Sequence, residues 1–131
     1  MTDLVVDASA IAGWLLPHED GAAFDALVGQ GATFHAPWLI WAELRNILIL
    51  QERRGRLLQG QSDRAVAAFD RLGVTLDTSA PSEVVMGLAR RHRLTVYDAL
   101  YLELAIRRGW PLVTRDRALA SAVRAEGQTD L

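Results

Sequence analysis

Short apolar runs alternate along the chain with longer segments in which apolar residues recur every three or four positions. The runs predict strands, because buried strands of parallel sheets are short and continuously apolar. The periodic segments predict helices, since a 3.6-residue repeat gathers such positions on one face. The strands are predicted over 4–7, 33–36, 74–77 and 112–114. The helices are predicted over 8–16, 19–28, 38–54, 61–72, 79–91 and 97–108, with a last helix after 116.

Residues at the expected ends of the helices support these boundaries. Pro37 stands where proline prefers to begin a helix, and Gly109 stands where glycine prefers to end one. Asp116 and Thr95 are candidate N-caps, whose side-chain oxygens accept hydrogen bonds from free backbone N–H groups. Ser79 begins a candidate capping box for another helix.

The regular alternation of strand and helix predicts an α/β fold with a mostly parallel central sheet and helices on both faces. The 131 residues are enough for one hydrophobic core, so a single domain over 1–131 is expected. The largely polar segment 126–131 could add a last edge strand.

Composition narrows the class of protein. Half of the residues are apolar, yet no apolar run approaches the roughly 20 residues of a membrane helix. The first residues lack the basic segment of a signal peptide, and there is no cysteine for disulfides, thiolate metal sites or a cysteine nucleophile. These features favour a cytoplasmic protein that does not contact a membrane.

The basic residues are unevenly distributed. The net charge is −2, but all 14 basic residues are arginine, and seven of them lie within 90–117. Arginine recognises phosphate groups through its planar guanidinium. The clustering therefore suits a phosphate-bearing partner, which the net charge alone would disfavour.

Four carboxylates are expected at one edge of the sheet. Asp7 ends the first strand, Asp116 follows the last one, and Asp98 opens a helix. Glu43 shares a helical face with apolar residues of the segment 38–54. Ligands of open α/β sheets bind beyond the carboxyl ends of the strands, and these four side chains can converge there.

These carboxylates have structural explanations as well as a chemical one. The three aspartates suit helix capping, whereas a buried ion pair of Glu43 with Arg45 or Arg115 would explain the glutamate. Four acids in one place would repel one another unless a cation lay among them. An all-oxygen cluster suits Mg²⁺ or Mn²⁺, and these ions usually act on phosphates.

Other chemistries are disfavoured by the residues. The three histidines lack the spacing of a zinc site and are expected on the surface or in loops. Ser9 and Thr114 have no histidine partner for a hydrolase triad, and they are expected to hydrogen bond to Asp7 and Asp116. The four tryptophans are expected in the core or at an interface rather than stacked on bases.

Four segments also resemble, in order and at similar intervals, the acid-bearing motifs of PIN-domain ribonucleases, and specifically of the VapC toxins of bacterial toxin–antitoxin pairs. The segments are 5–10, 36–46, 94–102 and 112–119. The resemblance covers nearly the whole chain. It implies a PIN-like domain with metal-dependent endoribonuclease activity, usually dimeric and silenced by a small antitoxin protein.

The resemblance assigns a role to each carboxylate. Asp7 and Asp98 are the first choice as direct metal ligands, with Glu43 and Asp116 completing the cluster directly or through water. The ion would activate a water molecule for attack on a phosphodiester and stabilise the charge that develops on the phosphate.

RNA and proteins are both expected as partners. Arg115 and Arg117 are the first candidates to hold RNA phosphates beside the acids. The segment 38–50 is apolar on more than one face, which suits a homodimer and an antitoxin helix. An antitoxin is also expected to place an arginine among the four acids.

Alternative functions differ in their chemistry. Receiver domains and haloacid-type phosphatases also gather acids at a sheet edge, but those families rely on a lysine, and this chain has none. A non-catalytic PIN-like module that binds RNA or protein is the remaining alternative. Metal-dependent cleavage of RNA distinguishes it from the nuclease.

Overall fold

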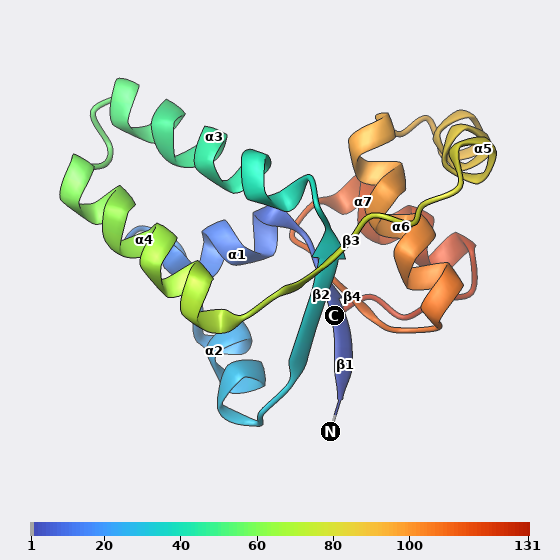
Figure 1. The fold of residues 1–131 in the computed structure, drawn as a ribbon, viewed down its shortest axis with the longest axis horizontal. Helices are drawn as coiled ribbons and strands as arrows, with labels where there is room; N and C mark the ends of the chain where they lie inside the picture. The colour runs from blue at the N-terminus through green and yellow to red at the C-terminus, as the bar shows by residue number, and fades with distance from the viewer. Residues whose placement is uncertain (1) are drawn as a thin grey trace.

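In the computed structural model, which describes residues 2–131, the strands form one sheet in the order β3-β2-β1-β4 (Figure 1). The strands are β1 (Asp3–Val6), β2 (Thr33–Pro37), β3 (Thr75–Asp77) and β4 (Leu112–Val113). All three strand pairs are parallel, as predicted. Because β1 pairs with strands on both of its sides, Asp7 emerges at the middle of the carboxyl edge.

Helices cover both faces of this sheet, which confirms the predicted architecture (Figure 1). One layer contains α1 (Ala8–Leu15), α2 (Ala22–Gly29), α3 (Ile40–Arg53) and α4 (Gln59–Leu72). The other contains α5 (Ser82–His92), α6 (Val96–Arg108) and α7 (Arg117–Ala125). In the first layer α1 contacts α2, α3 and α4, and in the second α6 contacts α5, α7 and the central strands.

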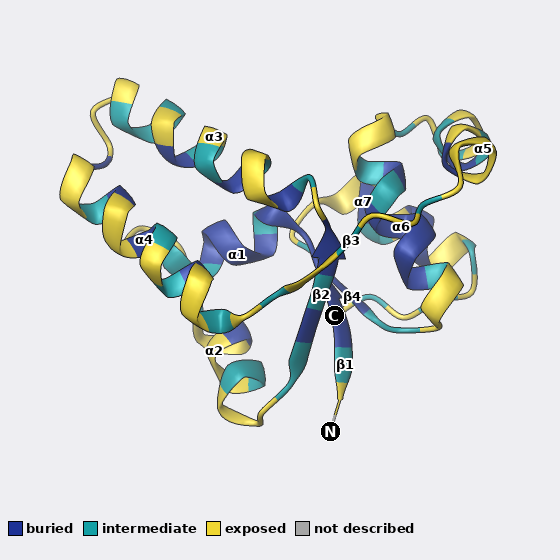
Figure 2. Ribbon diagram, in the orientation of Figure 1, coloured by how far each residue is buried: buried dark blue, intermediate teal, exposed yellow. Residues whose placement is uncertain are grey.

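The core lies where the central strands meet the two helical layers (Figure 2). Leu4, Val5 and Val6 of β1 are fully buried, because helices exclude water from both sides of the strand. Helix α6 contributes more buried residues than any other helix, namely Ala99, Tyr101, Leu102, Glu103, Leu104 and Ala105. These two central elements carry Asp7 and Asp98, so both acids are attached to rigid parts of the fold.

Three predicted helix starts are wrong. The helix predicted from residue 19 begins at Ala22, whose N–H is held by the Asp20 carboxylate at 3.0 Å. Pro37 ends β2, where it pairs with Asp77, and α3 begins only at Ile40. Proline's fixed φ is compatible with extended backbone as well as with a first helical turn, and pairing with β3 selects the former. Ser79 caps no helix, because its backbone N–H donates to the Asp77 carboxylate at 3.2 Å and α5 starts three residues later.

The expected positions of several aromatic residues also need correction. His35 lies within β2 and contacts Asp3 at 2.9 Å, and His92 ends α5 at 2.6 Å from Glu126, so neither is a free surface side chain. Both act as partners of carboxylates that hold elements together. Trp38 and Trp41 were expected in the core or at an interface; about half of each side chain is exposed, which excludes the core and leaves an interface as the prediction.

The last residues lie beside β4 without forming a regular strand. A single parallel bridge joins Leu112 to Asp130, so the predicted edge strand is reduced to one pair. Within the described residues, no helix is long and apolar enough to span a membrane.

Candidate active site

Asp7 is the most firmly held of the four acids. It is buried at the junction of β1 and α1, where its Oδ1 accepts hydrogen bonds from Ala10 N at 2.9 Å and Ser9 Oγ at 2.8 Å. The Thr114 hydroxyl donates to its Oδ2. Burial raises the pKa of Asp7, while these three hydrogen bonds oppose the rise. The side chain therefore caps α1 and at the same time faces the carboxyl edge of the sheet.

Ser9 and Thr114 form the expected support beneath Asp7. The Ser9 hydroxyl also accepts a hydrogen bond from Arg115 N at 2.9 Å, and the Thr114 hydroxyl accepts one from Asp116 N at 3.0 Å. The two hydroxyls thereby tie the segment after β4 to the segment after β1.

Glu43 lies in the first turn of α3 and is half-buried. Its Oε1 accepts a hydrogen bond of 2.6 Å from the hydroxyl of Tyr101 on α6. Burial raises the pKa of Glu43, the Tyr101 hydrogen bond lowers it, and the charge of Asp7 raises it. The partner of this carboxylate is thus a tyrosine, not the Arg45 or Arg115 of the ion-pair alternative.

Tyr101 is the residue of this site that the sequence argument missed. Its ring is 1% exposed, and burial beside Glu43 raises the pKa of the hydroxyl, which stays protonated as a donor. The available signal was its spacing from Asp98, because residues three apart on a helix lie on the same face. The surrounding apolar residues of α6 concealed it.

Asp98 and Asp116 complete the acidic group at two helix starts. Thr95 caps α6 as predicted, by accepting a hydrogen bond from Asp98 N at 3.1 Å, which leaves the Asp98 side chain free of that task. Asp116 caps α7 by accepting one from Leu119 N at 2.9 Å. Helix capping therefore explains the position of one carboxylate oxygen of Asp116. It does not explain the position of the Asp98 carboxylate.

All four carboxylates line one cavity of about 150 Å³. Its walls are formed by Asp7, Ala8, Ser9, Glu43, Ile47, Asp98, Tyr101 and Asp116. Burial raises the pKa of Asp98 to about 6, with further contributions from the charges of Asp116, Asp7 and Glu43. The predicted convergence of the acids is therefore present, and with it their mutual repulsion.

The four acids line one cavity, but their side chains do not yet form a set of metal ligands. Among residues 2–131, no three acidic or histidine side chains are already arranged to hold a metal ion. The chemistry of the donors nevertheless fits a hard divalent cation, since the cavity offers carboxylate and hydroxyl oxygens and neither thiolate nor imidazole.

Comparison with known proteins identifies the family. The model of the PIN domain matches residues 4–125. The chain is 36% identical over 120 residues to ribonuclease VapC3 of Pyrobaculum aerophilum, covering 89% of this chain and 92% of the relative. This chain belongs to the PIN-domain family, among the VapC ribonucleases. The resemblance inferred from the four acidic segments is confirmed.

Solved structures agree on the fold of this PIN domain. A crystal structure of a Pyrobaculum aerophilum protein superposes with a TM-score of 0.76 at 28% identity, covering 98% of this chain and 89% of that one. The VapBC2 structure of Rickettsia felis, bound to a DNA fragment from its promoter, gives a TM-score of 0.68 at 14% identity, with 99% and 98% covered.

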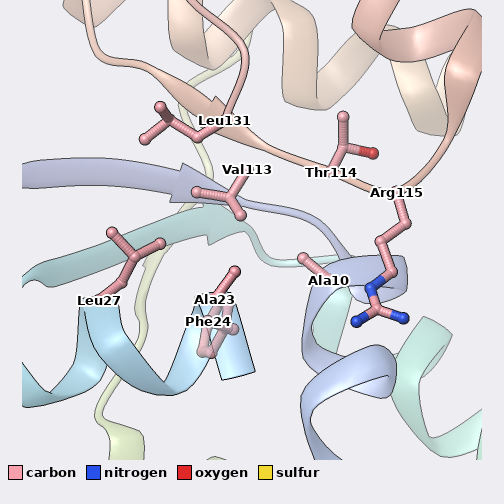
Figure 3. Close-up of a pocket in the computed structure, with 8 residues that line it drawn as sticks. All are labelled: Ala10, Ala23, Phe24, Leu27, Val113, Thr114, Arg115 and Leu131. Carbon is pink, nitrogen blue, oxygen red and sulfur yellow. The ribbon is translucent and has the colours of Figure 1, made fainter. Parts of the chain in front are cut away.

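The two arginines next to the acids are in different situations in this PIN domain. Arg115 extends toward α1 (Figure 3), where its guanidinium lies over Gly13, pairs with Glu19 at 2.9 Å and bonds to the Asp20 carbonyl. Arg117 is exposed and has no ion pair or hydrogen bond within the described residues. Of the two, Arg117 is the readier to meet a phosphate.

A second cavity is lined in part by Thr114 and Arg115 of the segment after β4 (Figure 3). It measures about 380 Å³ and is lined by Ala10, Ala23, Phe24, Leu27, Val113, Thr114, Arg115 and Leu131. No acidic side chain lines it, and its walls are mostly apolar. The oxygen donors that suit a divalent cation thus line the smaller, acidic cavity.

Proposed function

We propose that this PIN domain is an endoribonuclease that cleaves RNA phosphodiester bonds with Mg²⁺ or Mn²⁺, and that it is the cytoplasmic toxin of a toxin–antitoxin pair. The observation that carries the proposal is the convergence of four carboxylates from four separate segments on one cavity. Family membership supports the same activity.

The carboxylates would hold the ion. Asp7 and Asp98 are the proposed direct ligands, and Glu43 and Asp116 complete the cluster. A bound Mg²⁺ or Mn²⁺ supplies an activated water and stabilises negative charge on the phosphate. Burial and, next to it, the charges of the neighbouring acids raise the pKa of Asp98, and a cation in the cavity would relieve this repulsion, which supports the assignment.

The chain's own residues orient the acids and the substrate. Ser9 and Thr114 fix both oxygens of Asp7 and so set the direction of its carboxylate. Asp98 has its pKa near 6 and is mostly ionised at neutral pH, ready to bind a cation. Arg117 is exposed and follows Asp116 in the sequence, and we propose that it holds a phosphate next to the cleaved bond. Arg115 is the second candidate for this role.

The proposed protein partners are a small antitoxin and a second copy of this chain. The similar Rickettsia felis protein is a VapBC2 complex. In this chain Trp38, Trp41 and Ile49 expose apolar surface on and next to α3, which suits protein contacts.

Incubation of the purified chain with RNA tests the activity. Cleavage is expected with Mg²⁺ or Mn²⁺ and not with chelator. Asp7→Ala should lower the rate more than about 100-fold, beyond the 10–100-fold typical of residues that only support a metal ligand. Asp63→Ala, which removes an exposed carboxylate of α4, is the control and should cleave normally. No metal-dependent cleavage by the folded wild-type chain would favour the non-catalytic module instead.

A further inference from the structure

Tyr101 lines the acidic cavity from the buried middle of α6. Its ring is 1% exposed and is enclosed by neighbours in the core, so the ring cannot easily change its orientation. The hydroxyl at the end of that ring therefore occupies a fixed point, 2.6 Å from Glu43 Oε1. A fixed donor of this kind can determine where a mobile acceptor lies.

Glu43 depends on such a donor for its orientation. Its carboxylate is at the end of a longer side chain than an aspartate, and it stands on α3, in the opposite helical layer from α6. Within residues 2–131 the only hydrogen bond to the Glu43 carboxylate comes from the Tyr101 hydroxyl, which donates to Oε1. Asp7, by contrast, is held by three donors. The Tyr101 contact is therefore the one bond that orients Glu43.

The same contact connects the two helical layers across the cavity. Asp98 and Tyr101 are both on α6, one helical turn apart, so fixing Glu43 to Tyr101 also fixes its position relative to Asp98. Hydrogen bonds to charged carboxylates are short and strong, and 2.6 Å is within that range.

We propose that Tyr101 is a positioning residue that holds Glu43 Oε1, so that Oε2 is presented to a divalent cation in the acidic cavity. The proposal rests on the metal-dependent function proposed above and extends it to a residue outside the four acids. It requires no movement of Tyr101 itself.

Direct binding of Mn²⁺ without RNA tests the proposal in the Tyr101→Phe variant, which keeps the ring and removes only the hydroxyl. The matched control is Tyr97→Phe, the same change at the chain's other tyrosine, which lies on the same helix and is 57% exposed. Mn²⁺ affinity, measured by calorimetry, should fall about tenfold in Tyr101→Phe. It should change less than about twofold in Tyr97→Phe. Cleavage by Tyr101→Phe should recover at saturating Mn²⁺.

A mutant cycle shows whether Tyr101 acts through Glu43. In a Glu43→Ala background, adding Tyr101→Phe should change Mn²⁺ affinity less than about twofold, because the group that Tyr101 orients is gone. Glu43→Asp shortens the acid so that it no longer reaches the Tyr101 hydroxyl, and it leaves the core unchanged. This variant should reproduce the tenfold loss of Mn²⁺ affinity. It provides the test if Tyr101→Phe does not fold.

The outcomes separate this inference from the proposed function. If the wild type binds Mn²⁺ and cleaves RNA and the Mn²⁺ affinity of Tyr101→Phe is unchanged, the role of Tyr101 is overturned and the nuclease remains intact. A loss that persists in full without Glu43 would also overturn it. Failure of the wild-type chain to bind Mn²⁺ would remove both.

Discussion

At the scale of single residues, the pKa of Asp98 depends on its burial and on the charges of the other three acids. Burial and the charges of Asp116, Asp7 and Glu43 raise its pKa from 3.8 to about 6. The folded state therefore binds this proton more tightly than the unfolded state does. The resulting contribution to stability is present at low pH and is lost as the pH rises from about 4 through 6.

Asp98→Asn should accordingly stabilise the metal-free protein above pH 6. With chelator at pH 8, the variant should melt about 4 °C higher, equivalent to about 1 kcal/mol after allowance for solvent screening at a half-buried site. At pH 5 the advantage should fall to about half, because Asp98 is then protonated in the folded wild type but already ionised in the unfolded chain. Saturating Mg²⁺ should reverse the order, since only the wild type gains the full binding energy. Melting curves at the two pH values check this, and a difference that does not depend on pH would contradict it.

The four acids could be predicted from the sequence because each occupies a junction or a helical face that geometry defines. Their supports Ser9 and Thr114 could be predicted too, but the partner of Glu43 could not. Glu43 was expected to pair with Arg45 or Arg115 if it was structural, yet its partner is Tyr101, 58 positions away. Local patterns do not state which distant side chain will meet a half-buried acid, since that depends on the packing of two helical layers.

At the scale of elements, α6 is joined to β3 by a buried ion network. Glu103 is 3% exposed and pairs with Arg107 at 2.9 Å, and Arg107 also holds both oxygens of Asp77 at the end of β3. The Arg107 hydrogen bonds lower the pKa of Asp77. This network fixes the helix that carries Asp98 and Tyr101 against the far edge of the sheet.

Arg107→Ala should destabilise the fold by about 2–3 kcal/mol, because it leaves Glu103 buried without a counter-charge. This loss is at or below the roughly 3–5 kcal/mol usual for removing one partner of a buried ion pair, because Arg107 and Asp77 are partly open to water. Arg108→Ala is the matched control, since its guanidinium only lies over the Trp110 ring at 5.0 Å. Denaturant unfolding measures the loss of stability in both variants. Equal losses would contradict a stabilising role of the ion network.

Periodicity was sufficient to locate the helices but not all of their ends. The start of α7 at Asp116 followed from capping chemistry, which is local. The start of α3 did not, because Pro37 was drawn into β2 by pairing with a strand 40 positions later. Boundaries set by neighbouring residues are predictable, whereas those set by sheet register require the fold.

At the scale of the whole molecule, the sequence indicated parallel strands but not their order. Strand–helix alternation does not specify to which side each crossover passes, and the order β3-β2-β1-β4 depends on the complete chain. That order places β1 inside the sheet and Asp7 at its centre. It also leaves α3 at the surface with Trp38 and Trp41 exposed beside it.

Expression of this chain alone should arrest bacterial growth if it is the toxin of a pair. Asp7→Ala should remove the arrest while leaving the protein folded, and a small protein encoded beside it should restore growth and co-purify with the wild type. Replacing Trp38 and Trp41 by alanine should weaken that co-purification, because apolar surface would be lost from the expected contact. Growth curves with verified expression provide the measurement. Normal growth with abundant folded wild-type chain would argue against the toxin role.

The bond between Thr114 and Asp7 spans 107 positions of the sequence, and this separation has a consequence in time. On a ribosome, Asp7 is synthesised roughly 5–20 s before Asp116 at ordinary rates of bacterial translation. Until residue 116 has left the exit tunnel, β1 has no β4 to pair with, and the acidic cavity is incomplete. The proposed nuclease site is therefore absent from the nascent chain until synthesis is nearly finished, and we expect no cleavage of RNA before that point.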